Sequence, residues 1–140
     1  YGLCESIKMI QEEGLEKIIR RHSKLAEATR IAVTNWELEI NALNPNEYSN
    51  SLTAVLLPQG YNSDTFREIV LENFNVSLGN GLGQLNTKAF RIGHLGNLNE
   101  PMLIGTLGAI EMGLEIAKIP HSKSGVRAAM DHLVLENNEA

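Results

Sequence analysis

The sequence has one cysteine and no long hydrophobic run. Cys4 has no second thiol with which to form an internal disulfide or a cysteine-based zinc cluster, and such sparing use of cysteine fits a reducing compartment. No stretch reaches the ~18 uninterrupted apolar residues of a membrane-spanning helix. The N-terminus also lacks the charged and then apolar pattern of a secretory signal. The sequence therefore predicts a soluble chain with no membrane partner.

Positive charge is scarce as well. The 140 residues include 12 Lys and Arg against 17 Asp and Glu, which gives a formal net charge of −5 at pH 7. Proteins that bind the phosphate backbone of nucleic acids carry clustered basic charge, so nucleic acid is an unfavourable partner. Hydrophobic residues at 43% and charged residues at 21% are close to globular averages, which excludes wholesale disorder. A chain of this length predicts one folded domain.

Apolar residues that recur near a 3.6-residue period predict four helical stretches. The first is expected to be broken or bent at Gly14, and Ser63 or Asp64 is expected to cap the second. Asn97 or Asn99 is expected to cap the third. The predicted helices cover residues 3–33, about 63–74, about 101–118 and about 124–135, and the polar tail 136–140 is expected to fray.

Short segments with alternating or continuous apolar character predict the strands. A half-buried strand is expected at Trp36–Ile40, a buried strand at Leu52–Leu57 and a brief strand at Val76–Leu78. Glycines 79, 81 and 83 are expected to interrupt regular structure before a last strand at Lys88–Leu95. The predicted fold class is α+β, with helices flanking a small, mostly antiparallel sheet of three or four strands.

The last strand predicts two contrasting faces. Alternation sends Phe90 and Ile92 to one face, and places Arg91 on the other face between Ala89 and Gly93. The strand Leu52–Leu57 is apolar on both faces, so we expect both to be covered. The chain also begins at Tyr1, without an initiator Met and already with helical spacing. A covering element outside the chain and an origin in a longer protein are therefore expected.

Arg91 is the candidate binding residue. Its planar fork suits two-point binding of a carboxylate or a phosphate, and a strand holds it more rigidly than a loop would. The alternative is a structural salt bridge to an Asp or Glu of the same chain. The residues alone leave both interpretations open.

Other patterns are weaker. The segment Gly79–Gly83 fits neither G-x-G-x-x-G nor Walker A, and a turn is the favoured interpretation over a phosphate loop. Gly105, Ala109 and Gly113 lie four apart, which favours close packing of a helix on its neighbour. The histidines show no i, i+4 pairing, so structural or solvated roles are favoured over metal binding; they are His22, His94, His121 and His132.

Two segments together carry a resemblance to a known family: Phe74–Gly83, with the sequence FNVSLGNGLG, and Phe90–Gly96, with the sequence FRIGHLG. The chain resembles the C-terminal part of the class V, fold type I, pyridoxal-phosphate-dependent aminotransferases, most nearly the serine-glyoxylate and alanine-glyoxylate enzymes. The similarity covers almost the whole chain, from Tyr1-Gly2-Leu3 to Ile119-Pro120-His121. Thr87 stands where a glycine is more usual in the family.

The resemblance implies that residues 1–140 are a small C-terminal domain of a longer enzyme, packed on a larger cofactor domain. The active site would lie between the two domains and be completed across a homodimer. Arg91 would bind the carboxylate of an amino-acid or oxo-acid substrate, and Gly79–Gly83 would form a structural turn near the cleft. Pyridoxal 5'-phosphate would belong to the intact parent enzyme, because the segments with the Schiff-base lysine, the aspartate on the pyridine nitrogen and the phosphate cup are missing. We therefore expect no catalytic or cofactor-binding residue here, and no activity from the fragment alone.

The preferred hypothesis is the small domain of an enzyme that moves an amino group from serine or alanine to glyoxylate. The competing hypothesis is a free-standing carboxylate-binding or dimerisation module without chemistry. The tail ending Asn137-Asn138-Glu139-Ala140 is not of the peroxisomal Ser-Lys-Leu type, so a cytoplasmic location is expected.

Overall fold

The computed structural model describes residues 1–138, and the side chains of residues 1–135. Within this range the chain forms five α-helices and a four-stranded sheet, which confirms the predicted α+β class. The strands lie in the order β1-β2-β4-β3, and every neighbouring pair is antiparallel. The elements are α1 (Gly2–Glu13), α2 (Leu15–Asn35), β1 (Glu39–Ile40), β2 (Leu52–Leu56), α3 (Ser63–Phe74), β3 (Gly79–Asn80), β4 (Ala89–Gly93), α4 (Glu100–Ile116) and α5 (Gly125–Asn138).

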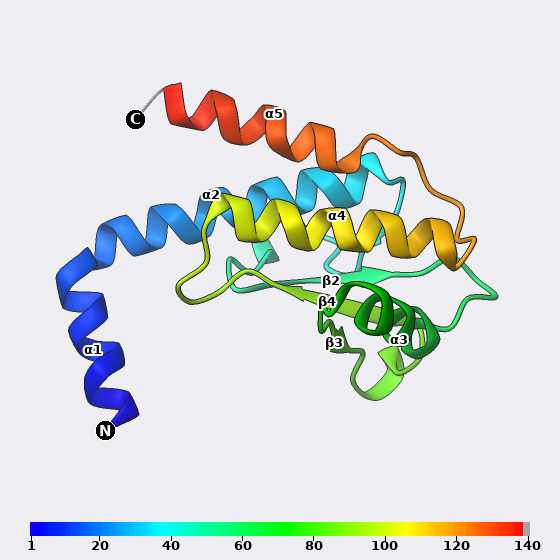
Figure 1. Cartoon of the computed structure of the whole chain (residues 1–140), viewed down its shortest axis with the longest axis horizontal. Coiled ribbons are helices and arrows are strands. Elements are labelled where there is room, and N and C mark those ends of the chain that lie inside the picture. The colour runs from blue at the N-terminus through cyan, green and yellow to red at the C-terminus, as the bar shows by residue number, and fades with distance from the viewer. Residues whose placement is uncertain (139–140) are drawn as a thin grey trace.

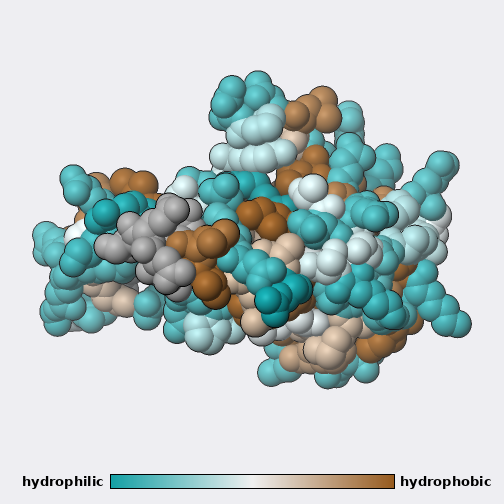
Figure 2. All heavy atoms as spheres, turned by 90° about the horizontal axis from the view of Figure 1, so that it is seen from above, coloured by the Kyte–Doolittle hydropathy of each residue, from teal (hydrophilic) through white to brown (hydrophobic). Residues whose placement is uncertain are grey.

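The hydrophobic core lies between one face of the sheet and the helices. Val55, Phe90 and Ile92 are fully buried on this face, and the ring of Phe66 from α3 packs against Phe90 with centroids 4.9 Å apart. Helices α2 and α4 run across the same face, and α5 packs on both of them as an outer layer (Figure 1). Seen from the side of α5, the surface is mainly hydrophilic, with apolar residues in small separate groups (Figure 2).

Two glycines allow a break between helices and a close contact between helices. Gly14 has a φ of 89°, in the left-handed region, and it separates α1 from α2 as predicted. Gly113 lets α4 approach α3, because a Cβ added there would lie 2.5 Å from Val70 Cγ2. The predicted packing face holds for Gly113 and for buried Ala109, but Gly105 is exposed and has open space around it.

The structure corrects the predicted cap of α3 and the predicted end of α5, and it confirms a predicted cap of α4. Asn62, one residue earlier than expected, caps α3 by accepting from the backbone of Asp64 and Thr65, while Ser63 is the first helical residue. Asn99 caps α4 by accepting from Met102 N, so the second of the two predicted candidates holds. Helix α5 extends to Asn138 rather than fraying from residue 136, and residues 139–140 lie outside the described range.

Two predicted strands are displaced. The prediction at Trp36–Ile40 is mostly wrong because α2 continues to Asn35 and Trp36 ends it, so only Glu39 and Ile40 pair with β2. The prediction at Val76–Leu78 is wrong, since the paired residues are Gly79 and Asn80. The expectation that the glycines interrupt all regular structure therefore fails at Gly79, which pairs opposite Arg91.

The second face of the sheet carries no comparable cover in the described chain. Thr53 and Val55 of β2 are buried, whereas Leu52 is exposed and Ala54 and Leu56 are half-buried. None of the twelve residues of α1 is buried either, although Leu3, Ile7 and Ile10 are apolar, and Figure 1 shows this helix projecting from the rest. Among the described residues, no helix is both long and apolar enough to cross a membrane.

Thr87 precedes β4 with an unusual backbone conformation. Its φ is 62°, in the left-handed region that a β-branched residue rarely adopts. Its carbonyl accepts a hydrogen bond from Ser63 N at 2.8 Å, and Leu85 O accepts one from Lys88 N at 3.0 Å, so the surrounding turn holds the residue in place. The backbone at residue 87 therefore favours glycine, which is the residue that the resemblance led us to expect there.

We predict that Thr87→Gly raises the free energy of unfolding by up to about 1 kcal/mol. A left-handed conformation costs a residue with a side chain about 1 to 2 kcal/mol, and the added flexibility of glycine in the unfolded chain takes back about half of that. Urea unfolding measures the difference. Asn75→Gly is the matched control, because Asn75 has a φ of 55° but asparagine tolerates it, so its effect should be smaller. Equal effects of the two changes would contradict strain at Thr87.

His94, directly after β4, is fully buried and hydrogen-bonded through both ring nitrogens. Nδ1 lies 3.2 Å from Asn50 O and donates to it, so Nε2, at 3.0 Å from Thr53 Oγ1, accepts from that hydroxyl. In the neutral imidazole both ring nitrogens thus have a hydrogen-bond partner. Burial lowers the pKa of the His94 imidazole from 6.5 to about 4, because the charged form would lose its hydration.

We predict that the folded chain loses stability as the pH falls from about 6.5 to about 4. The unfolded chain takes up a proton on His94 in this range and the folded chain does not, so the free energy of unfolding falls by up to about 3 kcal/mol and this group adds no further loss at lower pH. Urea unfolding at several pH values tests this. His94→Gln should remove that part of the pH dependence, and an unchanged slope in the variant would rule His94 out as its source.

Candidate functional site

Arg91 lies in the middle of β4 on the open face of the sheet. The antiparallel register places Ala54 of β2 on one side of it and Gly79 of β3 on the other. Along its own strand, the residues on the same face are Ala89 and Gly93. The sequence predicted the two small neighbours along the strand, and the structure adds two more across it. The neighbours of Arg91 on this face are therefore all small, although Ala89 is itself fully buried and Gly93 is exposed.

The side chain of Arg91 is held through one nitrogen. Nε donates to Asn80 O at 2.8 Å, and the half-buried chain lies beside Gly79. Within the described residues no carboxylate pairs with Arg91, and Nη1 and Nη2 have no hydrogen-bond partner. The structural salt bridge that was the alternative in the sequence is thus not formed by the described part of the chain.

Two other partly buried arginines of the fold pair with carboxylates. Arg21 binds Glu13 with two parallel bonds of 2.7 Å, from Nε to Oε1 and from Nη2 to Oε2. The hydrogen bond from Arg21 lowers the pKa of the Glu13 carboxyl. Arg67 pairs with Asp64 at 2.9 Å. Arg91 differs from both because the donors at the outer edge of its fork are available for a ligand.

Helix α2 anchors the loop that follows the Arg91 strand. Arg21 Nη1 donates to Gly96 O at 2.7 Å and to Leu98 O at 3.1 Å, and Gly96 N donates to His22 Nε2 at 2.9 Å. His22 Nδ1 donates in turn to Ile18 O at 2.7 Å. The sequence offered no periodic signal for this network, because residues about 75 positions apart make it.

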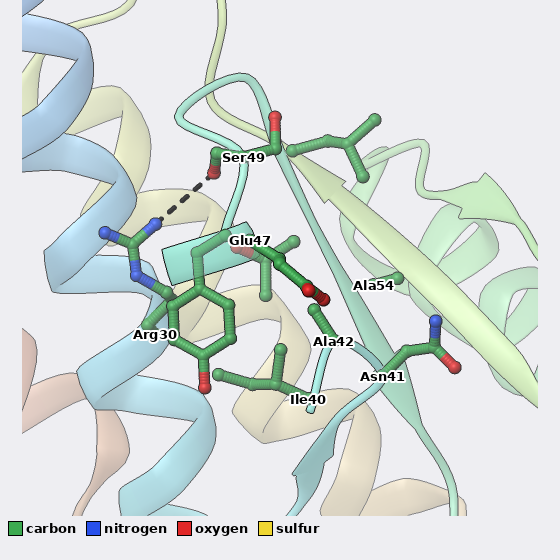
Figure 3. Close-up of a pocket in the computed structure, with 10 residues that line it drawn as sticks. Arg30, Ile40, Asn41, Ala42, Glu47, Ser49 and Ala54 are labelled. Atoms are coloured by element: carbon green, nitrogen blue, oxygen red, sulfur yellow. Dashed lines mark hydrogen bonds between the residues drawn. The ribbon is translucent and has the colours of Figure 1, made fainter. Parts of the chain in front are cut away.

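Arg91 lines none of five cavities on the described part of the chain. A groove of about 420 Å³ runs between α1, α2 and residues 95–97. A pocket of about 200 Å³ lies at the β1 edge, where Arg30 donates to Ser49 O at 3.3 Å and lies over the Tyr48 ring (Figure 3). Arg91 instead lies on the second face of the sheet, outside these cavities.

The residues of this chain do not fit a pyridoxal-phosphate site. Such a site needs a lysine amine directed into a cleft, together with donors for the phosphate. Lys118 lines a cavity of about 330 Å³, but the Glu115 carboxylate lies in the same lining and disfavours a phosphate there. Lys123 is exposed and paired with Glu115 at 2.8 Å. No group of three or more potential metal ligands lies together among the described residues.

The site contains one contact that sequence reasoning missed. The glycine-rich segment was interpreted as a turn near the cleft, but Gly79 and Asn80 are a paired strand whose backbone holds Arg91. A small residue is needed opposite Arg91, and Gly79 meets that need. The sequence alone could not identify Gly79 as this residue, because it does not show which residues of the two strands pair.

Comparisons with known proteins support the resemblance. No family model matches the chain. The chain is 44% identical over 135 residues to the serine-glyoxylate aminotransferase of Arabidopsis thaliana, which covers 95% of the chain and 33% of that protein. It is 38% identical over 132 residues to the L-aspartate-glyoxylate aminotransferase of Paracoccus denitrificans, with coverage of 94% and 33%.

The fold agrees with these relatives. The crystal structure of pyridoxamine-pyruvate aminotransferase from Mesorhizobium loti superposes with a TM-score of 0.86 at 27% identity, over 92% of the chain and 33% of that structure. The chain thus spans about a third of the length of the proteins it matches. Sequence and fold together place the chain in the class V aminotransferases, a pyridoxal-phosphate-dependent family, and it is similar to the C-terminal third of the serine-glyoxylate and alanine-glyoxylate enzymes.

Proposed function

We propose that the chain is the C-terminal domain of an aminotransferase that moves an amino group from serine or alanine to glyoxylate, and that Arg91 binds the substrate carboxylate. The carrying observation is the half-buried guanidinium on the open face of β4, with its Nη donors unpaired in the described chain. Amino acids and oxo acids both carry a carboxylate next to the reacting carbon, so one arginine serves both half-reactions. A planar fork fixes that carboxylate at two points and orients the reacting carbon.

The proposal assigns the open face of the sheet to a larger cofactor-binding domain. Leu52, Leu56 and Arg91 would lie beneath this domain, and the apolar side of α1 would pack on it. The site would be completed across a homodimer in the cytoplasm. Pyridoxal phosphate, held by the larger domain, supplies the electron sink for the transfer. The role of this chain is to bind and orient the substrate.

The amino donor is the least constrained part of the proposal. The relatives at 44% and 38% identity are named for serine and for L-aspartate as partners of glyoxylate. Arg91 recognises the carboxylate that these donors share and does not discriminate their side chains. We favour serine or alanine on the resemblance alone, because the residues that would select the side chain of the donor belong partly to the larger domain.

We predict that Arg91→Lys in the complete enzyme lowers kcat/KM for glyoxylate by about one to two orders of magnitude. Lysine keeps the charge but loses the planar two-point contact, and one charge-assisted hydrogen bond is worth roughly 1.5 to 3 kcal/mol. Cofactor binding and melting temperature should change little. Steady-state kinetics, cofactor titration and thermal unfolding of the same variant provide the measurements.

Arg127→Lys is the control for this experiment. Arg127 lies on the exposed side of α5 and pairs only with Asp131 at 2.9 Å among the described residues, so its replacement should leave kcat/KM unchanged. An Arg91→Lys enzyme with normal kcat/KM and a lowered melting temperature would show a structural role instead, and would remove the carboxylate-binding assignment.

We predict that the 140-residue chain alone does not retain pyridoxal phosphate. Lys118 lines a cavity that also holds the Glu115 carboxylate, which would repel the cofactor phosphate, so the cofactor should leave on dialysis. Absorbance after dialysis and mass spectrometry after borohydride treatment test this. A cofactor fixed by borohydride to one lysine at full occupancy would contradict the assignment of the cofactor to another domain.

A further inference from the structure

Gly79 and Arg91 are directly opposite each other on neighbouring strands. A Cβ added at residue 79 would lie 3.1 Å from Arg91 Cβ, 3.1 Å from Arg91 Nε and 3.5 Å from Arg91 Nη2. The arginine therefore runs through the space that a side chain at position 79 would begin to fill. The Arg91 side chain crosses β3 beside Gly79, and its Nε donates to the carbonyl oxygen of the following residue, Asn80, at 2.8 Å.

The backbone gives no other reason for a glycine at this position. Gly79 lies in β3 and is not among the residues with a positive φ, so an L-residue could adopt its conformation without strain. Gly81, two residues later, is different, because a Cβ there would lie 2.0 Å from the backbone oxygen of Leu85. Gly81 is required by the turn, whereas the close neighbour of Gly79 is the Arg91 side chain.

The hydrogen bond to Asn80 also decides which edge of the fork can meet a ligand. A guanidinium can offer a carboxylate either Nε with Nη2 or the two Nη nitrogens together. In Arg91 the Nε proton is already used by Asn80 O. The outer edge, Nη1 with Nη2, is the part left for two-point binding, so the carboxylate approaches end-on.

We propose that Gly79 is a positioning residue for the substrate carboxylate. Its missing side chain lets Arg91 lie against β3 with Nε on Asn80 O, and this fixes the outer edge of the fork for end-on binding. The inference rests on the proposed function of Arg91 and adds the residue that sets the geometry of that arginine. A methyl group at position 79 would push the guanidinium outward by a few tenths of an ångström and weaken the Asn80 bond.

The first test measures this geometry without any substrate. In the 140-residue chain labelled with nitrogen-15, exchange of the Arg91 Nε proton with water should be slow, and Gly79→Ala should accelerate it about three- to tenfold, as expected for a weakened hydrogen bond. Gly93→Ala is the control, since it adds a methyl on the same face with nothing within 4 Å. Unchanged exchange in Gly79→Ala, or equal acceleration in Gly93→Ala, would overturn the proposal.

The second test is a double-mutant cycle in the complete enzyme. Gly79→Ala should lower kcat/KM for glyoxylate about three- to tenfold with the melting temperature retained, mainly through a higher KM. In the Arg91→Lys background the same change should cost almost nothing further, because a residue that acts through Arg91 has no effect once that fork is gone. Additive losses, or normal kcat/KM in Gly79→Ala, would overturn the role of Gly79.

The two failures are distinguishable. If Arg91→Lys lowers kcat/KM and Gly79→Ala does not, Gly79 has no positioning role and the proposed function stands. If Arg91→Lys itself leaves kcat/KM unchanged, the proposed function fails, and the substrate role of Gly79 fails with it.

Discussion

Phe90 and Arg91 are neighbours in β4 and face opposite environments. Phe90 is fully buried against α3, while Arg91 is half-buried on the face that no described helix covers. A central strand can hold a cation in this way only if the sheet is layered on one side, because a guanidinium buried beneath a second helix layer would need a carboxylate partner. The one-sided packing of the sheet is therefore the condition on which the candidate site depends.

The fixed position of Arg91 comes from contacts on both sides of its strand. Pairing with β2 and β3 holds the backbone, and Asn80 O holds Nε. Beyond the strand, Arg21 fixes the following loop to α2 through Gly96 and Leu98. These bonds order the arginine in advance, so a ligand need not meet the full entropic cost of ordering a flexible side chain.

The sequence predicted those parts of the fold that repeat. Alternation in β4 separated the core residues from Arg91, and helical periodicity located the helices to within a few residues. It failed where structure depends on distant partners: β3 has two residues and no periodicity, and Trp36 reads as a strand residue although its indole donates to Glu111 of α4. Gly79 was interpreted as part of a turn because glycine most often serves positive φ, whereas here the opposing side chain explains it.

Arg91 in the uncovered chain is a weak site for physical reasons. Water solvates a half-exposed guanidinium and screens its attraction for a carboxylate, so an ion pair there is worth at most about 1 kcal/mol. Covering the face by a second domain would remove that water and strengthen the same pair, provided the substrate supplies the missing charge. If the proposed function holds, covering Arg91 without a bound carboxylate would be less favourable than covering it with one. The unpaired Nη donors would thus couple substrate binding to closing of the cleft.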